Sequence, residues 1–139
     1  MTIKHKILLS YIKDLSVETP DAESLIAARE NIPKYSLKLD LTSEILKNKM
    51  IEVNTKLTYQ DKINKKKTHI EMIYSTVVRI EEEKPNPKEL KKFILRDLQI
   101  QIYPQIEKTF MEILKLSGFP NLKSKNKINF DKLYKENMN

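Results

Sequence analysis

The chain of 139 residues has no cysteine and only one glycine, and each shortage excludes a kind of chemistry. A chain without cysteine forms no disulfide, builds no thiolate metal site and offers no cysteine nucleophile. The single glycine, Gly118, cannot supply the glycine-rich loop that binds phosphate groups in many nucleotide-binding proteins. The lack of cysteine also fits a protein that works in a reducing compartment.

Near the N-terminus, an extended apolar stretch of the kind that targets or anchors proteins is missing as well. Ile7 to Leu9 form an apolar run that is far too short for a signal peptide or a membrane span, and Lys13 and Asp14 follow it closely. We therefore expect a soluble, cytoplasmic protein that does not insert directly into the membrane.

The side chains that usually carry catalysis or bind metals are few and scattered. His5 and His69 each lie beside lysines, and neither has a histidine or carboxylate partner at the spacing of a metal site. The serines do not occur in a nucleophile-elbow motif. We predict no catalytic residues, no metal site and no cofactor, and we expect a binding protein rather than an enzyme.

Basic charge is plentiful, since 26 lysines and arginines stand against 19 acidic residues and give a net charge of +7. Residues 60–69 and the last twenty residues are especially rich in lysine. A positive chain attracts phosphate groups, so a basic nucleic-acid-binding module remains an alternative reading. A solvated basic surface without a nucleic-acid partner explains the same charge, and it is the reading that we prefer.

Apolar residues alternate with polar ones in the first half of the chain, which is the pattern of strands with one covered face. The clearest segments are residues 35–41, 50–59 and 69–80, and a less regular segment spans residues 8–18. The lysine-rich residues 61–67 suit a hairpin connection. The segment between Pro20 and Pro33 is too long for a hairpin connection. It is predicted to be a crossover loop, which could include a helical turn. Together these patterns predict a four-stranded antiparallel sheet.

The second half of the chain is predicted to be helical. Asn86 suits a helix cap, Pro87 suits the first helical position, and the helix is expected to end at Ser117 with Gly118 in a left-handed conformation. Pro104 lies inside this pattern and predicts a kink in one continuous helix. The apolar stripe winds around the helix, because a four-residue period drifts by about 40° per step. The stripe consists of Leu90, Ile94, Leu98, Ile102, Ile106 and Phe110.

A last short helix is predicted to begin after Asn129, which has the side chain of a helix cap. Ile128 precedes the cap and Leu133 takes the fourth helical position, which is the spacing of a hydrophobic staple. The whole chain, residues 1–139, is thus expected to form one α+β domain with a four-stranded antiparallel sheet, one long kinked helix and a short C-terminal helix.

Four segments, in order along the chain, resemble the SecB family of protein-export chaperones. They are "YIKDLSVETPDAE" at residues 11–23, "KLDL" at 38–41, "IYPQIEKTFMEILKLSGFP" at 102–120 and "INFDKLY" at 128–134. The middle of the chain is similar mainly in its strand pattern. The resemblance implies the α+β fold predicted above, in a SecB-like form, assembled as a homotetramer that is a dimer of dimers.

The resemblance also implies a function. Members of this family are cytosolic molecular chaperones that bind unfolded preproteins in hydrophobic grooves, keep them competent for translocation and deliver them to the SecA ATPase for export. Exposed apolar surface suits this task, because it binds unfolded chains without reading their sequence. The family has no catalytic site and needs no cofactor.

The resemblance assigns two sets of residues. Asp14, Glu18 and Glu71 match the acidic residues that dock SecA, Glu71 by strand alignment alone, although a solvated strand face is the preferred explanation for any one of them. The candidates for the client-binding groove are apolar and could instead be core residues. They are Val17, Ile32, Leu37, Leu39, Leu41, Phe119, Leu122, Phe130, Leu133 and Tyr134.

The chain departs from the family pattern in its charge. Relatives are usually acidic, whereas this chain carries +7, and Lys65 to Lys67 could weaken the attraction to the basic tail of SecA. The polar loop "KSKNK" at residues 123–127 replaces a stretch that is apolar in relatives. A SecB-like chaperone dedicated to one partner, such as an antitoxin, is therefore a second alternative.

Overall fold

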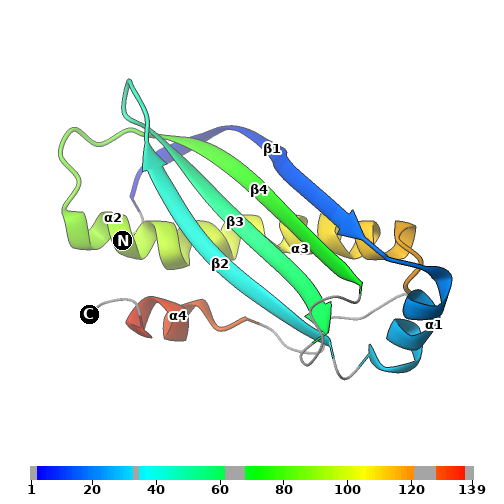
Figure 1. Ribbon diagram of the computed structural model, residues 1–139. Coiled ribbons are helices and arrows are strands. Elements are labelled where there is room, and N and C mark those ends of the chain that lie inside the picture. The colour runs from blue at the N-terminus through cyan, green and yellow to red at the C-terminus, as the bar shows by residue number, and fades with distance from the viewer. Residues whose placement is uncertain (1–2, 33–34, 62–67, 121–127, 137–139) are drawn as a thin grey trace.

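The computed structural model describes residues 3–32, 35–61, 68–120 and 128–136, and it confirms the predicted α+β fold (Figure 1). Four strands precede one long helical segment and a short last helix. The elements are β1 (His5–Glu18), α1 (Ala22–Glu30), β2 (Tyr35–Ile45), β3 (Met50–Asp61), β4 (His69–Ile80), α2 (Pro87–Lys92), the π-helical turn η2 (Phe93–Asp97), α3 (Leu98–Leu116) and α4 (Phe130–Glu136).

The sheet has the strand order β1-β4-β3-β2, and every neighbouring pair is antiparallel, as predicted. The period-two pattern fixes the register, since Leu57 of β3 lies between Leu39 of β2 and Met72 of β4 on one face. β1 and β2 are the two edge strands. β1 contains two register irregularities, one between Ile7 and Leu9 and one between Ile12 and Asp14, which explains why its alternation is less regular in sequence.

The shortage of glycine is visible in the turn between β2 and β3. Asn48 and Lys49 have φ angles of 59° and 60°, the left-handed region that glycine occupies most easily. Two successive left-handed residues are the geometry of a type I′ hairpin turn, whose twist matches that of the strands. The connection between β3 and β4, predicted as a hairpin, falls at residues 62–67, outside the described residues.

The segment between β1 and β2 is more ordered than its sequence suggested. Residues 22–30 form the helix α1, whereas the sequence predicted a crossover loop that could include a helical turn. The Asp21 side chain caps this helix, because its Oδ1 accepts a hydrogen bond of 2.7 Å from the backbone N–H of Ser24. This bond holds the pKa of Asp21 below its ordinary value.

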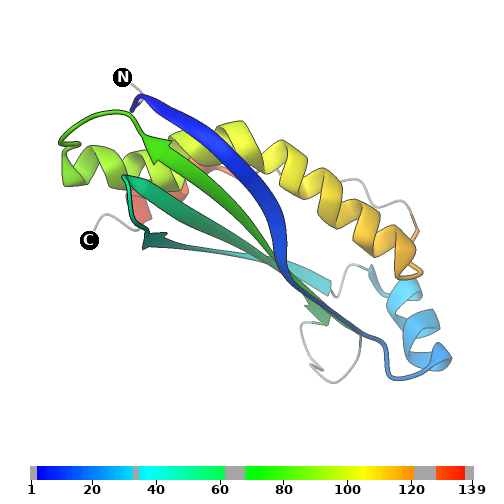
Figure 2. The same ribbon diagram turned by 90° about the horizontal axis from the view of Figure 1, so that it is seen from above.

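The long helical segment forms as predicted at both ends. Asn86 caps α2, since its Oδ1 accepts from the Lys88 N–H at 2.8 Å, and Pro87 is the first helical residue. α3 runs through Pro104 as one continuous helix. Its last residue is Leu116, Ser117 is the C-cap residue, and Gly118 follows with a φ of 100°. Figure 2 shows the long segment crossing one face of the twisted sheet.

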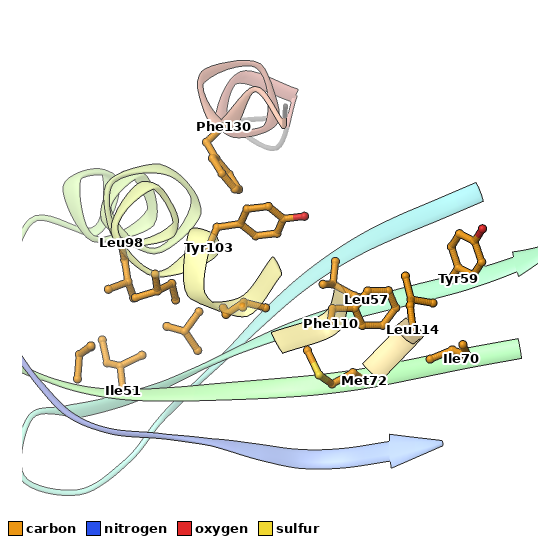
Figure 3. Close-up of a cluster of buried hydrophobic side chains, with 14 of the residues drawn as sticks. Ile51, Leu57, Tyr59, Ile70, Met72, Leu98, Tyr103, Phe110, Leu114 and Phe130 are labelled. Carbon is orange, nitrogen blue, oxygen red and sulfur yellow. The ribbon is translucent and has the colours of Figure 1, made fainter. Parts of the chain in front are cut away.

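The core lies between this helix and the sheet, where Phe110 and Leu114 point toward Met72 and Ile70 (Figure 3). Several polar side chains are buried as well, and two of them, Gln99 and Thr55, are joined across the core. Gln99 is fully buried, and its Nε2 donates to the Thr55 Oγ1 at 3.2 Å. The largest apolar side chains that are fully buried are Phe93, Phe110, Leu57, Ile70, Met72, Leu98, Ile106 and Leu114.

Candidate binding surfaces

The long helix covers the middle strands of the sheet and leaves the edge strands partly open on the same face. On β2, Leu37 is exposed, while Leu39 and Leu41 are half-buried. Their partners on β3 are Tyr59, Leu57 and Thr55, all of which are buried. We call Leu37, Leu39 and Leu41 the β2 margin. It brings three of the predicted groove residues into one continuous apolar row.

Val17 lies at the opposite edge of the sheet from the β2 margin. It pairs with Ile70 of β4, Ile70 pairs with Tyr59 of β3, and Tyr59 pairs with Leu37. Val17, Ile70, Tyr59 and Leu37 thus form a second row, which runs across all four strands. The two residues at its ends are exposed and the two between them are buried. Phe119, which follows the long helix, packs on the middle of this row, with its ring centroid 5.3 Å from that of Tyr59.

The other predicted groove residues differ in exposure. Phe119 and Phe130 are only 3% and 8% exposed and belong to the core of this chain. Ile32, Leu133 and Tyr134 are half-buried. Leu122 lies outside the described residues. Of the lysine-rich stretches that motivated the nucleic-acid alternative, residues 62–67 and 123–127 lie outside the described residues, whereas Lys132 and Lys135 are exposed on α4.

α4 carries three of these residues and is attached to the long helix at two points. The Phe130 ring packs edge-on against Tyr103, with centroids 5.4 Å apart. Burial raises the pKa of the Tyr103 phenol, so this ring stays neutral at physiological pH. Arg96 of η2 donates hydrogen bonds to Asp131 of α4 and, at 2.5 Å, to Asp97, and both bonds raise its pKa.

The helix cap of α4 agrees with the prediction. The Asn129 side chain accepts a hydrogen bond from the Lys132 backbone N–H at 3.0 Å. Ile128 and Leu133 are both partly buried against the core. α4 is therefore held by its own cap as well as by the contacts with the long helix.

A small open pocket of about 310 Å³ lies where α1 meets the chain that leaves the long helix. It is lined by Ile26, Arg29, Glu30 and Pro120. Next to it, Gly118 comes so close to Leu25 that a Cβ atom on the glycine would lie 2.8 Å from the leucine Cδ2. The glycine therefore allows both the left-handed turn and the close approach of α1.

The face of the sheet turned away from the helix, which we call the outer face, is mostly polar, although the register also places Leu9, Ile73 and Val77 there. The pairing register places Asp14, Glu18 and Glu71 there, so the three acidic residues assigned by resemblance share one face. The register and the Lys13–Glu52 contact assign six acidic and five basic residues to this face. The acidic residues are Asp14, Glu18, Asp40, Glu44, Glu52 and Glu71, and the basic ones are Lys6, Lys13, Lys38, Lys56 and Arg79.

Besides the long contact of 3.8 Å between Lys38 and Asp40, two short ion pairs on the outer face were not predicted. The Lys13 Nζ lies 2.5 Å from Glu52, and the Lys56 Nζ lies 2.7 Å from Glu71. Each carboxylate raises the pKa of its lysine, mainly through the hydrogen bond. The alternation in β3 already placed Glu52 and Lys56 opposite the core face, so part of this pattern was readable in the sequence. The position of Lys13 was not readable, because it depends on the bulge after Ile12.

Among the described residues, histidine and carboxylate side chains do not gather in a group of three that could hold a metal ion. The described helices also include none with the length and apolarity that a membrane crossing needs. What the sheet offers is an apolar margin on one face and a mixed-charge surface on the other. These features suit a protein that binds other chains rather than one that carries a catalytic centre.

Comparison with known proteins agrees with this class. The family model described as preprotein translocase subunit SecB matches residues 2–139. A provisionally named protein-export protein SecB of Pelagibacter ubique (strain HTCC1062) is 42% identical over 140 residues and covers all of both chains. The chain belongs to the SecB family of protein-export chaperones, which are not enzymes.

Two further relatives are more distant. The protein-export protein SecB of Rhodopseudomonas palustris (strain BisB18) is 27% identical over 136 residues, which cover 95% of this chain and 79% of the relative. A Mycobacterium tuberculosis SecB-like chaperone, solved with a peptide of the HigA1 antitoxin, superposes with a TM-score of 0.64 at 12% identity. That match covers 86% of this chain and 84% of the other, and it shows that the fold is shared.

Proposed function

We propose that this protein works in the cytoplasm, where it holds unfolded preproteins along the β2 margin and keeps them competent for translocation. The observation that supports this is the partly exposed row of Leu37, Leu39 and Leu41 on an edge strand. Within the described part of the chain, β2 is an edge strand whose outer backbone N–H and C=O groups an extended client can pair with, while the leucines contact its apolar side chains. Such binding requires little sequence specificity.

The test compares a double variant, Leu37→Ser with Leu41→Ser, with the control Leu116→Ser. Leu116 is 77% exposed on α3, so its substitution removes a similar apolar side chain away from the margin. Several unrelated unfolded preproteins are diluted from denaturant, and their aggregation is followed by light scattering. The double variant should lose protection while the control keeps it, with thermal unfolding of both close to wild type. Full protection by the folded double variant would contradict the proposal.

We also propose that the outer face delivers clients to SecA through Asp14, Glu18 and Glu71. Their common location on an open polar face supports this, because a flat charged surface is well suited to a partner of opposite charge. Changing Asp14 and Glu18 to the neutral amides should weaken SecA binding, and the loss should shrink as salt is added. SecA binding that is the same in this variant and in the wild type would exclude docking at these residues.

Self-association into a dimer of dimers is a third part of the proposal. β1 is an edge strand, and it exposes apolar side chains on both of its faces, among them Leu9, Ile12 and Leu15. An exposed apolar edge of this length is a surface that proteins usually cover. Native mass spectrometry should find a tetramer, and a stable monomer at micromolar concentration would contradict this assembly.

A chaperone dedicated to one antitoxin is the second candidate, and the shared fold with the mycobacterial chaperone bound to an antitoxin peptide favours it. The breadth of clients separates the two functions. Protection of several unrelated preproteins supports general export, whereas protection of one cognate partner alone supports the dedicated role.

A further inference from the structure

Lys56 lies at the centre of the acidic part of the outer face. Its Nζ is 2.7 Å from Glu71 of the adjacent strand β4, and the charges of Asp40 on the adjacent strand β2 and of Asp14 on the more distant β1 also act on it. The lysine belongs to β3, Glu71 to β4, Asp40 to β2 and Asp14 to β1, so all four strands contribute. The lysine therefore lies among the very carboxylates that a cationic partner would seek.

The second internal pair, between Lys13 and Glu52, is built differently. The bulge between Ile12 and Asp14 turns Lys13 onto the outer face, where it covers a carboxylate whose side chain is only 10% exposed. Lys56 is as exposed as Lys13, at 41%, but the side chain of its partner Glu71 keeps 26% of its surface in contact with solvent, against 10% for Glu52. An exposed ion pair contributes little and is readily exchanged, whereas a covered carboxylate is costly to leave without its cation.

We propose that Lys56 is an internal counterion that determines how strongly the outer face binds a cationic partner surface. A partner cation must take the place of Lys56 beside Glu71, while the Lys13–Glu52 pair stays in place and preserves the face. The balance of six acidic and five basic side chains makes this face selective, because a weakly cationic surface gains too little to displace the lysine. The inference rests on the proposed docking of SecA at this face and names the residue that tunes it.

The test uses Lys56→Met, which keeps the long apolar stem of the side chain and removes its charge. The control is Lys108→Met, which makes the same change in net charge on an exposed position of α3, away from the outer face. Binding is measured by calorimetry at two salt concentrations with two probes, SecA and a decalysine peptide. Circular dichroism checks the fold of every variant.

Lys56→Met should bind each probe about threefold more tightly than wild type at low salt, and the gain should fade at high salt. Lys108→Met should show much less gain. The gain from Lys56→Met should also shrink in a Glu71→Gln background, since the carboxylate that the lysine covers is then neutral.

The two probes separate this inference from the proposed delivery role. A gain with decalysine and no SecA binding by any variant would support the inference and contradict SecA delivery. Equal affinities of Lys56→Met and Lys108→Met for both probes would overturn the inference, whatever SecA does.

Discussion

Gly118 allows the sharpest test of how the long helix is joined to α1. With a φ of 100°, the residue lies where side chains are disfavoured, and a Cβ atom there would lie 2.8 Å from the Leu25 Cδ2. Gly118→Ala therefore carries two separate costs. The left-handed backbone costs about 1–2 kcal/mol, and moving the leucine off its rotamer adds about 1 kcal/mol.

One effect opposes these costs. Alanine lowers the conformational entropy of the unfolded chain, which stabilises the folded state by about 0.5 kcal/mol. The net loss in the free energy of unfolding should thus be about 2 kcal/mol. Urea unfolding of the variant and the wild type at equal protein concentration measures it. A loss below about 0.5 kcal/mol, within the range of ordinary surface substitutions, would refute the reasoning about the left-handed position.

A double-mutant cycle with Leu25→Ala separates the two costs. Without the leucine methyl groups the close contact disappears, so Gly118→Ala should cost about 1 kcal/mol less in that background. Equal costs in both backgrounds would show that the contact with Leu25 plays no part. Client binding by the folded Gly118→Ala variant then tells whether the position of Phe119, the next residue, matters for function.

Lys49→Gly should raise the free energy of unfolding by about 0.5–1 kcal/mol, because glycine takes the left-handed φ of 60° without strain; urea unfolding measures the gain. The Ser24 N–H lowers the pKa of Asp21, so the Asp21 cap of α1 is complete above the ordinary aspartate pKa of about 4 and is lost as the pH falls through the lowered value. The asparagine of Asp21→Asn does not titrate. In this variant, amide exchange in α1 should therefore not respond to this acid range beyond the change in the intrinsic exchange rate. The buried Gln99 Oε1 has no hydrogen-bond partner among the described residues, so replacing both polar partners, as in Gln99→Met with Thr55→Val, should stabilise the fold by about 1 kcal/mol. Thr55→Val alone should destabilise it, because it leaves the Gln99 Nε2 without its acceptor. Calorimetric melting measures both effects, and a double variant as stable as the wild type would contradict the prediction.

The sequence predicted the elements whose signals are local. Alternation gave β4 its full extent at residues 69–80, and the caps at Asn86 and Asn129 placed the starts of two helices. α1 was underestimated, because a helix of nine residues that buries only Ala28 has little amphipathic pattern to detect. Local sequence patterns were therefore sufficient to predict the long strands and helices, in which the apolar period repeats several times.

The candidate surfaces were predictable only in part. Strand parity alone places Leu37, Leu39 and Leu41 on one face, but it cannot tell that the helix leaves this edge open. The burial of Phe119 depends on a ring contact with Tyr59, 60 residues earlier in the chain, which no local pattern encodes. The ion pair of Lys13 likewise depends on a bulge that shifts the parity of β1.

The π-helical turn at residues 93–97 gives the long helix one more residue than regular α-helical winding would need. One extra residue rotates everything that follows by about 100°, which offsets much of the drift of a four-residue apolar stripe. Ile102, Ile106 and Phe110 consequently stay buried after the turn. The extra residue thus keeps the apolar stripe facing the sheet along both halves of the helix. Deleting one residue within the turn would restore regular winding and turn its two halves out of step, so that only one half could face the sheet.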